Sequence, residues 1–498
     1  MDASFKKLLD ISKELALLGY AQGVLGWDEQ VNMPATGAPA RAEAGAYLAQ
    51  KAHEILASPQ VGELLEKLSG WEKAKAPDSF EGASIRRMRR NYDKAVKIPA
   101  ELVAEMSRAS SEGFQTWLAA RQEKSFRIFA PKLQRLVELQ RQAAQALGYE
   151  KEPYDALLDL FEEGMKAALV EGVFQKLEAG LMPLVQAVAQ HLERVDDRFL
   201  RGSFSEEDQW KLNLEALDFI GFDRERGRLD RSAHPFTSGF YPGDVRLTTR
   251  FGDTLTSALF STLHEGGHGL YEQGLPAEWW GTPVGEASSL GMHESQSRLW
   301  ENVVGRSRPF WERFRARVTH YFPELEERSV EDFYRAVNRV EMSLIRVEAD
   351  ELTYNLHIFL RFRLERQMIN GQLEVKDLPE VWNQAVKETW GRAPTHDGEG
   401  VLQDVHWSGT SMGYFPSYTF GNIYSLQLVE TARREEEVAR GMEAGDFQPL
   451  GKWMREQIHK RAGLYSGMEL LEKVTGRGPD PQPYLAYLRT KYQEIYGF

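Results

Sequence analysis

The segment from Leu263 to Gly269 reads LHEGGHG and contains the pattern HExxH. Residues four positions apart lie on the same face of an α-helix, so His264 and His268 can reach one metal ion if this segment is helical. Glu265 then points toward the open coordination position, where it can act as a general base. The pattern therefore predicts a helix, a zinc site and metal-assisted hydrolysis.

A third metal ligand must come from elsewhere in the chain, because two histidines supply half of a tetrahedral zinc site. The chain has no cysteine, so this ligand must be His, Asp or Glu. Glu272 follows His268 at helical spacing, but it would lie about 12 Å from His264 along the helix axis, too far to share an ion. We therefore search for the ligand further along the chain.

The next predicted helix offers three glutamates as candidate ligands. After the prolines and glycines at 276–285, we expect helix to resume over Ala287–Val304. Glu286 resembles an acid at a helix start, and we expect Glu301 to be solvated. We select Glu294 as the third ligand, because it lies mid-helix in a segment with little other charge.

Two adjacent glycines separate the metal-binding histidines. Gly266 and Gly267 each cost a helix about 1 kcal/mol relative to Ala, which indicates that another part of the chain approaches closely there. The preceding run from Thr254 to Leu263 is mostly apolar. We therefore expect the His pair to be buried.

Composition favours a large globular protein. The chain has 498 residues, of which 42% are hydrophobic and 11% aromatic, enough for a sizeable core. The formal net charge of −13, with no concentrated Lys/Arg tract, argues against a nucleic-acid partner. The uncharged stretch at 407–429 has the length of a membrane span, but it is rich in hydroxyl and amide side chains. We interpret it as an active-site wall and expect no membrane partner.

We expect a soluble, cytoplasmic protein. Charges lie among the apolar residues Leu8, Leu9 and Ile11, where a signal peptide would need an unbroken apolar core. The lack of cysteine is compatible with a reducing compartment.

Amphipathic helix dominates residues 1–200, and we interpret the charged faces as solvated. Apolar residues recur at helical spacing in Leu48–Leu56, Val61–Leu68, Ile85–Val96, Leu102–Ala120, Ile128–Leu147 and Val170–Leu192. Breaks are predicted at Pro59, Gly70, Pro77, Pro99, Pro131, Gly148 and Pro153.

The pattern changes near residue 230. Residues 234–240 and 245–251 are β-prone, and Pro242 and Gly243 between them are a pair typical of the centre of a type II turn. We predict a β-hairpin just before the metal helix. Either its edge pairs with an extended peptide or the hairpin merely packs on helices, and the sequence alone leaves both interpretations open.

Six motifs make the chain resemble the Taq carboxypeptidase family of metallocarboxypeptidases, and they occur in the family's order. They are HPF at 234–236, DxRxT at 244–248, HExxH at 264–268, HESQ at 293–296, IRxxAD at 345–350 and GxxQDxHW at 400–407. WDEQVNMP at 27–34 and GYFPSY at 413–418 are also similar to the family, so the resemblance covers nearly the whole chain.

The resemblance implies a mainly α fold of neurolysin/ACE-like gluzincin architecture, with a deep active-site groove and a small antiparallel β-sheet near the zinc helix. It implies a single catalytic domain over residues 1–498, with two helical halves flanking the groove. It also implies a homodimer and one Zn²⁺ per subunit, for which Co²⁺ can substitute. The substrate-binding residues that the motifs indicate are His234, Asp244, Arg246, Thr248, Arg346, Asp350, Gln403 and Asp404.

Removing a residue from a peptide C-terminus requires a cation for the terminal carboxylate, and a planar guanidinium binds carboxylates bidentately. The candidates are Arg246 on the hairpin and Arg346, which we expect on a long helix after Ser329. Spacing alone is also compatible with an ordinary i,i+4 pair between Arg346 and Asp350. The family resemblance favours Arg346 as the substrate ligand, with Asp350 orienting it.

His406 lies in a glycine-containing segment and is either a neutral core histidine or a catalytic one. In the catalytic interpretation, His406 donates a hydrogen bond, together with Tyr414 or Tyr418, to the oxyanion formed at the scissile carbonyl. Glu265 accepts a proton from the attacking water and returns it to the leaving amine.

The sequence thus predicts a zinc metallocarboxypeptidase that releases single residues, with broad side-chain specificity, from peptides with a free C-terminus. One alternative is a groove-type zinc oligopeptidase that cuts internally, because it would share the HExxH motif, a downstream glutamate ligand and His/Tyr oxyanion donors. Another is a catalytically silent peptide-binding protein that keeps metal for structure, although such a protein would not need Glu265.

Overall fold

A computed structural model describes residues 2–498 of the chain. The chain forms two compact units, each assembled from three separate segments of sequence. Unit 1 comprises Met1–Val96, Asp196–Val337 and Tyr424–Gly478, and unit 2 comprises Lys97–Val195, Asn338–Ile423 and Pro479–Phe498. Within the described residues, every helix is too short or too polar to cross a lipid bilayer.

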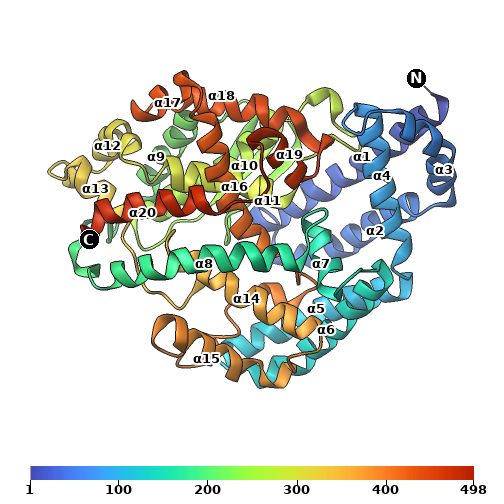
Figure 1. The fold of residues 1–498 in the computed structure, drawn as a ribbon, viewed down its shortest axis with the longest axis horizontal. Helices are drawn as coiled ribbons and strands as arrows, with labels where there is room; N and C mark the ends of the chain where they lie inside the picture. Colours follow the sequence, from blue (N-terminus) through green and yellow to red (C-terminus); the bar gives the residue numbers. More distant parts are fainter. Residues whose placement is uncertain (1) are drawn as a thin grey trace. The chain divides into compact units, whose positions relative to one another are not determined.

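Unit 1 is mostly helical and contains the only sheet of the described residues (Figure 1). Its helices pack around α10, which contacts α9, α11 and the strands β2 and β3. The helices are α1 Ala3–Val31, α2 Ala38–Leu56, α3 Pro59–Ala74, α4 Phe80–Lys97, α9 Glu206–Ile220, α10 Leu255–Gly274, α11 Leu290–Arg298, α12 Arg308–Tyr321, α13 Val330–Val337, α17 Glu436–Glu443, α18 Gln448–Gln457 and α19 Gly467–Thr475. The chain enters unit 1 for the last time within α16 Pro416–Ala432.

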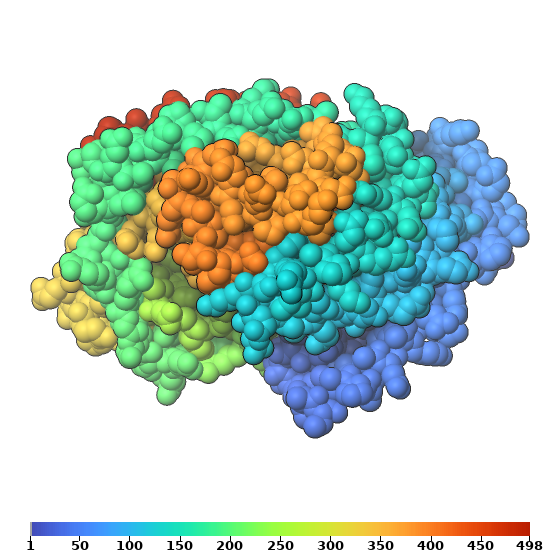
Figure 2. Space-filling model, turned by 90° about the horizontal axis from the view of Figure 1, so that it is seen from below, coloured from blue at the N-terminus to red at the C-terminus, as the bar shows by residue number. Residues whose placement is uncertain are grey.

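Unit 2 is helical throughout. α5 and α6 form a long helical hairpin, and Figure 2 shows the orange segment that includes α15 lying against these cyan helices. A second pair, α8 and α20, is in mutual contact. The helices of this unit are α5 Ala100–Gln122, α6 Phe126–Leu147, α7 Pro153–Phe161, α8 Ala167–Ala189, α14 Tyr354–Ile369, α15 Leu378–Trp390 and α20 Gln482–Tyr496.

Five of the predicted breaks separate helices and two do not. Pro59 and Pro153 begin α3 and α7, and Gly148 ends α6 with φ of 86°. α6 continues through Pro131, because proline removes one hydrogen bond near the helix start while the apolar face of the helix remains buried. α3 likewise continues through Gly70, a position where an isolated glycine weakens a helix without ending it.

The sheet has three strands, β1 Gly227–Arg231, β2 Thr237–Tyr241 and β3 Asp244–Thr249, in the order β1-β3-β2. β2 and β3 pair antiparallel, which confirms the predicted hairpin, but β1 pairs parallel to β3. The sheet is therefore mixed, and the expectation of an antiparallel sheet was wrong. The sequence GRLDR of β1 is rich in charge and gives little β-strand signal.

The hairpin turn also differs from the prediction. A type II turn requires a positive φ at Gly243, but the φ of Gly243 is not positive. The pairing register shifts between Gly239 and Tyr241, which places Tyr241 opposite Asp244. This irregularity closes the connection without a left-handed residue, so the turn is not type II.

Candidate active site

α10 carries both histidines of the metal motif, as the sequence predicts. Thr254 precedes α10, and most side chains of this helix are buried. The rings of His264 and His268 lie 5.0 Å apart between centroids, and their side chains are 20% and 16% exposed. The predicted helix and the mostly buried His pair are both confirmed.

The two glycines of the motif permit close approach by neighbouring helices. A Cβ atom on Gly267 would lie 2.5 Å from the carbonyl oxygen of Gln296, and one on Gly266 would lie 2.7 Å from Cδ1 of Ile220. α10 and α11 can therefore pack backbone to backbone, which brings the side chains of α11 within reach of the histidines.

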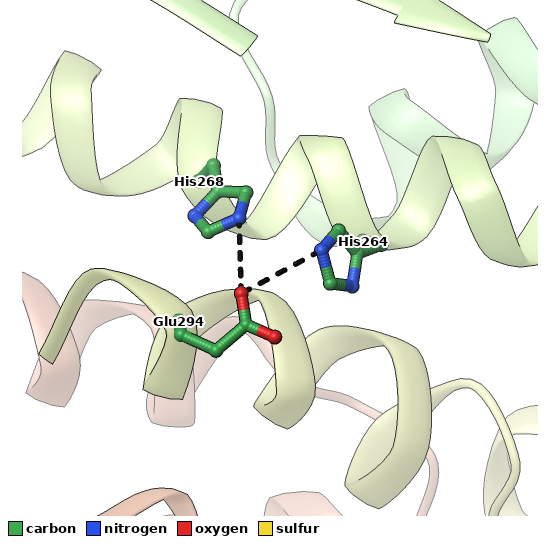
Figure 3. A group of neighbouring side chains, drawn as sticks. All are labelled: His264, His268 and Glu294. Atoms are coloured by element: carbon green, nitrogen blue, oxygen red, sulfur yellow. Dashed lines mark ion pairs between the residues drawn. The ribbon is translucent and has the colours of Figure 1, made fainter. Parts of the chain in front are cut away.

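Glu294 on α11 completes a group of three potential metal ligands (Figure 3). Its Oε2 lies 3.8 Å from Nε2 of His264 and 3.5 Å from Nε2 of His268. The ligand atoms lie within 4.8 Å of one another. Ligands on one tetrahedral zinc are about 3.3 Å apart, so small side-chain adjustments make this donor set fit the ion.

The region around Glu294 differs from the predicted single helix Ala287–Val304. α11 begins at Leu290, where Ser289 caps it, and a π-helical segment, Leu299–Val304, follows. Glu301 lies in this segment and was expected to be solvated. Its side chain is only 15% exposed, because it contacts His264 and Arg298.

Nδ1 of each histidine has a hydrogen-bond partner within the protein, so Nε2 is available to the ion. Oε2 of Glu301 lies 2.9 Å from Nδ1 of His264. Nδ1 of His268 lies 2.6 Å from Nδ1 of His293, whose Nε2 lies 2.7 Å from Oε1 of Glu272. Sequence reasoning missed these partners, although metal-binding histidines usually have one.

Glu265 is buried next to the histidines. Its Oε2 accepts a hydrogen bond of 2.7 Å from the hydroxyl of Thr237 on β2. Burial raises the pKa of this carboxyl, whereas His264 and Thr237 act in the opposite direction. A raised pKa suits a group that must accept and then release a proton.

Charges around the group favour one carboxylate ligand and one neutral histidine. Burial alone would raise the pKa of Glu294, but Arg298 and His264 hold it well below its usual value. Burial lowers the pKa of His268 to about 4. For His264, burial is outweighed by Glu294 and Glu301, which raise its pKa to about 8.

Among the hairpin residues predicted to bind substrate, Arg246 and Asp244 contact each other. The guanidinium donates from Nε to Oδ1 at 2.9 Å and from Nη2 to Oδ2 at 3.0 Å. It also lies over the rings of Trp27 and Phe240. The forked face of Arg246 is thus occupied by a carboxylate of its own chain.

The two other hairpin candidates do not join this pair. Thr248 is fully buried, and its hydroxyl bonds Ser232 and both backbone groups of Phe236, so in this conformation it has a structural role. The side chain of His234 is exposed in the segment before β2.

Arg346 does not lie on a long helix, because α13 ends at Val337 and Arg346 begins a short 3₁₀ turn. Asp350 is not its partner either. The Asp350 carboxylate accepts bonds from the backbone of Leu352 and Thr353, near the start of α14, and from the backbone of Glu341. The expected pairing of Arg346 with Asp350 was wrong, since these local donors occupy the carboxylate.

Asp404 is the residue that orients Arg346. It accepts from Nε of Arg346 at 2.7 Å and from Nε of Arg361 at 2.6 Å. Gln403 accepts from the backbone of Arg346 and from Arg361, and it donates to carbonyl oxygens of its own and neighbouring loops. From the sequence, Gln403 and Asp404 were expected to bind substrate, and their contact with Arg346 was not predicted. The sequence also gave no indication of Arg361 inside the buried helix α14.

His406 and Tyr418 also lie in unit 2, with Nε2 of His406 3.4 Å from the hydroxyl of Tyr418. The ring of Tyr414 packs against both. Burial lowers the pKa of His406 to about 4, so its imidazole is neutral at neutral pH. The structure therefore brings together the three residues that the sequence suggested as oxyanion donors.

Glu365 holds the segments that carry these three residues, and the sequence gave no sign of it. It is fully buried on α14 and accepts from Nε1 of Trp407 at 2.7 Å, the hydroxyl of Tyr154 at 2.7 Å and the backbone N–H of Gly413 at 2.9 Å. Burial raises the pKa of this carboxyl to about 7. Trp407 adjoins His406 and Gly413 adjoins Tyr414, so Glu365 fixes both segments at once.

A mainly helical chain in which two histidines and a glutamate converge, with a second glutamate beside them, has the architecture of a metal-dependent peptidase. The family model of carboxypeptidase Taq (M32) metallopeptidases matches residues 7–492. The chain belongs to this family, and it is a metallocarboxypeptidase that acts on peptides.

Relatives of this family match along the whole chain. "Thermostable carboxypeptidase 1" of Thermus thermophilus is 42% identical over 508 residues, covering 100% of this chain and 99% of that protein. "Carboxypeptidase 1" of Bacillus subtilis is 34% identical, covering 99% and 98%. The crystal structure of the M32 carboxypeptidase from Deinococcus radiodurans has a TM-score of 0.95 and 39% identity, covering 100% of both chains.

Proposed function

We propose that this metallocarboxypeptidase is a zinc enzyme that removes single residues from peptides with a free C-terminus. The observation that carries the proposal is the convergence of His264, His268 and Glu294, with Glu265 buried beside them. These three side chains would hold one zinc ion, and Co²⁺, which accepts the same nitrogen and oxygen donors, would substitute for it.

Zinc supplies Lewis-acid chemistry: it polarises a carbonyl group and lowers the pKa of water. The remaining chemistry belongs to the chain. Glu265 accepts a proton from the attacking water and transfers it to the nitrogen of the leaving amino acid. Thr237 holds one carboxylate oxygen of Glu265, so the other oxygen is available to the water.

Arg346 is the better candidate for the terminal carboxylate of the substrate. Arg346, Arg361 and Asp404 form one buried group in which two positive charges share one negative charge, leaving a net charge of +1. Arg246 and Asp244 neutralise each other. Within residues 2–498, Nη2 of Arg346 has no hydrogen-bond partner, so one end of this guanidinium is held while the other can bind an anion.

We assign Asp404 and Gln403 to positioning Arg346, and we assign the oxyanion contact to His406 with Tyr418 or Tyr414. A neutral imidazole can donate one hydrogen bond, as an oxyanion donor must. Asp244 and Arg246 would line the substrate site as a pair, with His234 beside the hairpin.

We further propose that the two units act as one catalytic domain and that the enzyme is a cytoplasmic homodimer.

The decisive experiment compares peptides that end in a free acid with the same peptides ending in an amide. Amidation should lower kcat/KM of the wild type by about 30-fold to several thousandfold, because a buried guanidinium loses a charged partner. In Arg346→Ala this ratio should be close to one, whereas Arg246→Ala should keep the wild-type ratio. Mass spectrometry of the products identifies the bond that is cut.

Two results would contradict this assignment. Equal cleavage of both peptides at internal bonds would make the enzyme an oligopeptidase. A wild-type ratio that persists in Arg346→Ala would place the carboxylate on another residue. Asp404 keeps Arg361 as a partner in the variant, so Arg346→Ala is expected to fold.

A further inference from the structure

A cavity of about 470 Å³ lies in unit 1, away from the three proposed ligands. Its wall includes Leu270, Gln273 and Gly274 from the last turns of α10, Trp300 from the π-helical segment, and residues of α18. This volume is within the range of about 300–1,000 Å³ that is typical of small-molecule sites. The helix α10, which carries both metal-site histidines, thus also forms part of the wall of a second, separate cavity.

The charge of this cavity is opposite to that of the chain. Arg226, Lys452, Arg455 and Lys460 line it, against the two acids Asp223 and Glu456. Lys460 pairs with Glu456. Within residues 2–498, Lys452 and Arg455 form no ion pair. A positive hollow in a chain with a net charge of −13 indicates an anionic ligand.

His459 places a further condition on the ligand, because one of its ring nitrogens is a hydrogen-bond acceptor. Its side chain is only 4% exposed, and Nε2 lies 2.9 Å from Oε1 of Gln296. The amide nitrogen of Gln296 donates to Ser295, so Oε1 is the acceptor and Nε2 of His459 carries the proton. Burial and Arg455 lower the pKa of His459 to about 3, so the ring is neutral.

Nδ1 of His459 is therefore a hydrogen-bond acceptor at the cavity wall. No partner for it occurs in the described part of the chain, and it lies next to Gly274. A ligand that complements this wall must carry negative charge and must also donate a hydrogen bond to Nδ1 of His459. Hydrogen phosphate does both, because it has P–O⁻ and P–OH groups, whereas an ionised carboxylate has no donor.

We propose that this cavity is a phosphate-binding site, which takes inorganic phosphate or the phosphate group of a small monoester. Lys452 and Arg455 neutralise the anion, and Nδ1 of His459 accepts from its P–OH group. Because His459 bonds Gln296, two residues after Glu294 on α11, a bound phosphate stiffens the helix that carries this proposed ligand.

Gly451 provides a matched pair of variants for the test. It lies in the first turns of α18 on the cavity wall, and an added Cβ would meet the Trp300 ring at 3.6 Å, an ordinary contact. Gly451→Ala and Gly451→Asp should therefore both fold, with circular dichroism as the check. The Asp variant places a negative charge in the cavity and the Ala variant does not.

Calorimetric titration of the metal-loaded chain with inorganic phosphate, glycerol 3-phosphate and succinate measures the site in a chloride background. Wild type and Gly451→Ala should bind one phosphate, and Gly451→Asp should bind it about tenfold more weakly or worse. Tighter binding of inorganic phosphate would identify free phosphate as the ligand, and tighter binding of glycerol 3-phosphate would identify a phosphate monoester. In wild type, bound phosphate should slow amide hydrogen exchange in α11.

Several results would overturn the proposal. Absence of phosphate binding would reject the site, and equal binding by all three proteins would place the phosphate elsewhere, for example on the metal. Succinate bound as tightly as phosphate would reject the role of His459. Unchanged exchange in α11 on saturation would reject the link through Gln296.

Discussion

At the scale of single residues, the site depends on the hydrogen-bond partners that hold each candidate ligand and catalytic side chain in place. His264 and His268 are each held at Nδ1, Glu265 is held by Thr237, and Arg346 is held by Asp404. Such contacts fix tautomers and orientations before substrate binds, so each can be removed and its effect measured.

Glu265 and Glu294 should respond differently to substitution. Glu265→Gln should keep the metal and lower kcat by about 10²–10⁴-fold, because the amide keeps the shape but cannot accept a proton. Glu294→Ala should lose much of the metal, since it removes a ligand. Elemental analysis of the purified variants and peptide kinetics measure both effects. A Glu265→Gln enzyme with normal turnover would exclude Glu265 from proton transfer.

Glu301 is expected to tune metal affinity without touching the ion. Glu301→Gln should weaken zinc binding by about 10–100-fold, because Nδ1 of His264 loses its charged partner. Glu286→Gln is the matched control, since Glu286 is exposed and stands outside the cluster. Competition with a chromogenic chelator gives both affinities. Equal affinities in the two variants would remove Glu301 from the site.

At the scale of elements, the metal group exists because α10 and α11 pack closely enough for side chains of both helices to meet. Gly267 permits this contact against the backbone of Gln296 and Ser297. Gly266 instead faces the ends of the Ile220 and Leu217 side chains, which can move. The two glycines therefore differ in what an added methyl group would displace.

Gly267→Ala should separate α10 from α11, costing about 1–3 kcal/mol of stability and weakening metal binding. Gly266→Ala should cost less, because flexible side chains can adjust and Ala favours helix by about 1 kcal/mol. Urea unfolding and chelator competition on both variants measure the difference. A Gly267→Ala protein with wild-type metal affinity would show that this close contact does not set the ligand geometry.

At the scale of the whole molecule, buried ionisable groups link the fold to pH. Glu365 has a pKa of about 7 in the folded chain, above the 4.5 of an ordinary glutamate, because burial disfavours its charge. A raised acid pKa contributes stability that is complete below the ordinary value and is lost as pH rises through the folded value. The titration of Glu365 should therefore lower the free energy of unfolding as the pH rises from 5 to 8.

The expected loss from Glu365 is about 3 kcal/mol across that range. Glu365→Gln removes the titration, so its stability should fall less than that of the wild type between pH 5 and pH 8. Urea unfolding at both pH values measures this difference. In the same variant, kcat should fall more than KM rises, if Glu365 positions His406 and Tyr414 as oxyanion donors. Parallel pH profiles would show that Glu365 does not titrate in this range.

The sequence by itself determined the elements whose signals are local. The spacing of His264 and His268, the glycines between them and the apolar run before them predicted α10 and its buried face. Glu294, which we selected from the sequence as the third ligand, lies close to both histidines in the folded chain. The order of the motifs identified the family. These features follow from helix periodicity and residue chemistry, which short stretches of sequence contain.

Only the tertiary structure decided which side chains are partners. Asp404, not Asp350, pairs with Arg346, and Arg361 binds the same carboxylate. Glu301 is buried beside His264, and β1 pairs parallel to β3. Arg346 and Asp404 are far apart in the chain, so no local spacing predicts their pairing. A buried charge is stable only where the folded chain supplies its partner, and that partner is chosen by packing across many residues.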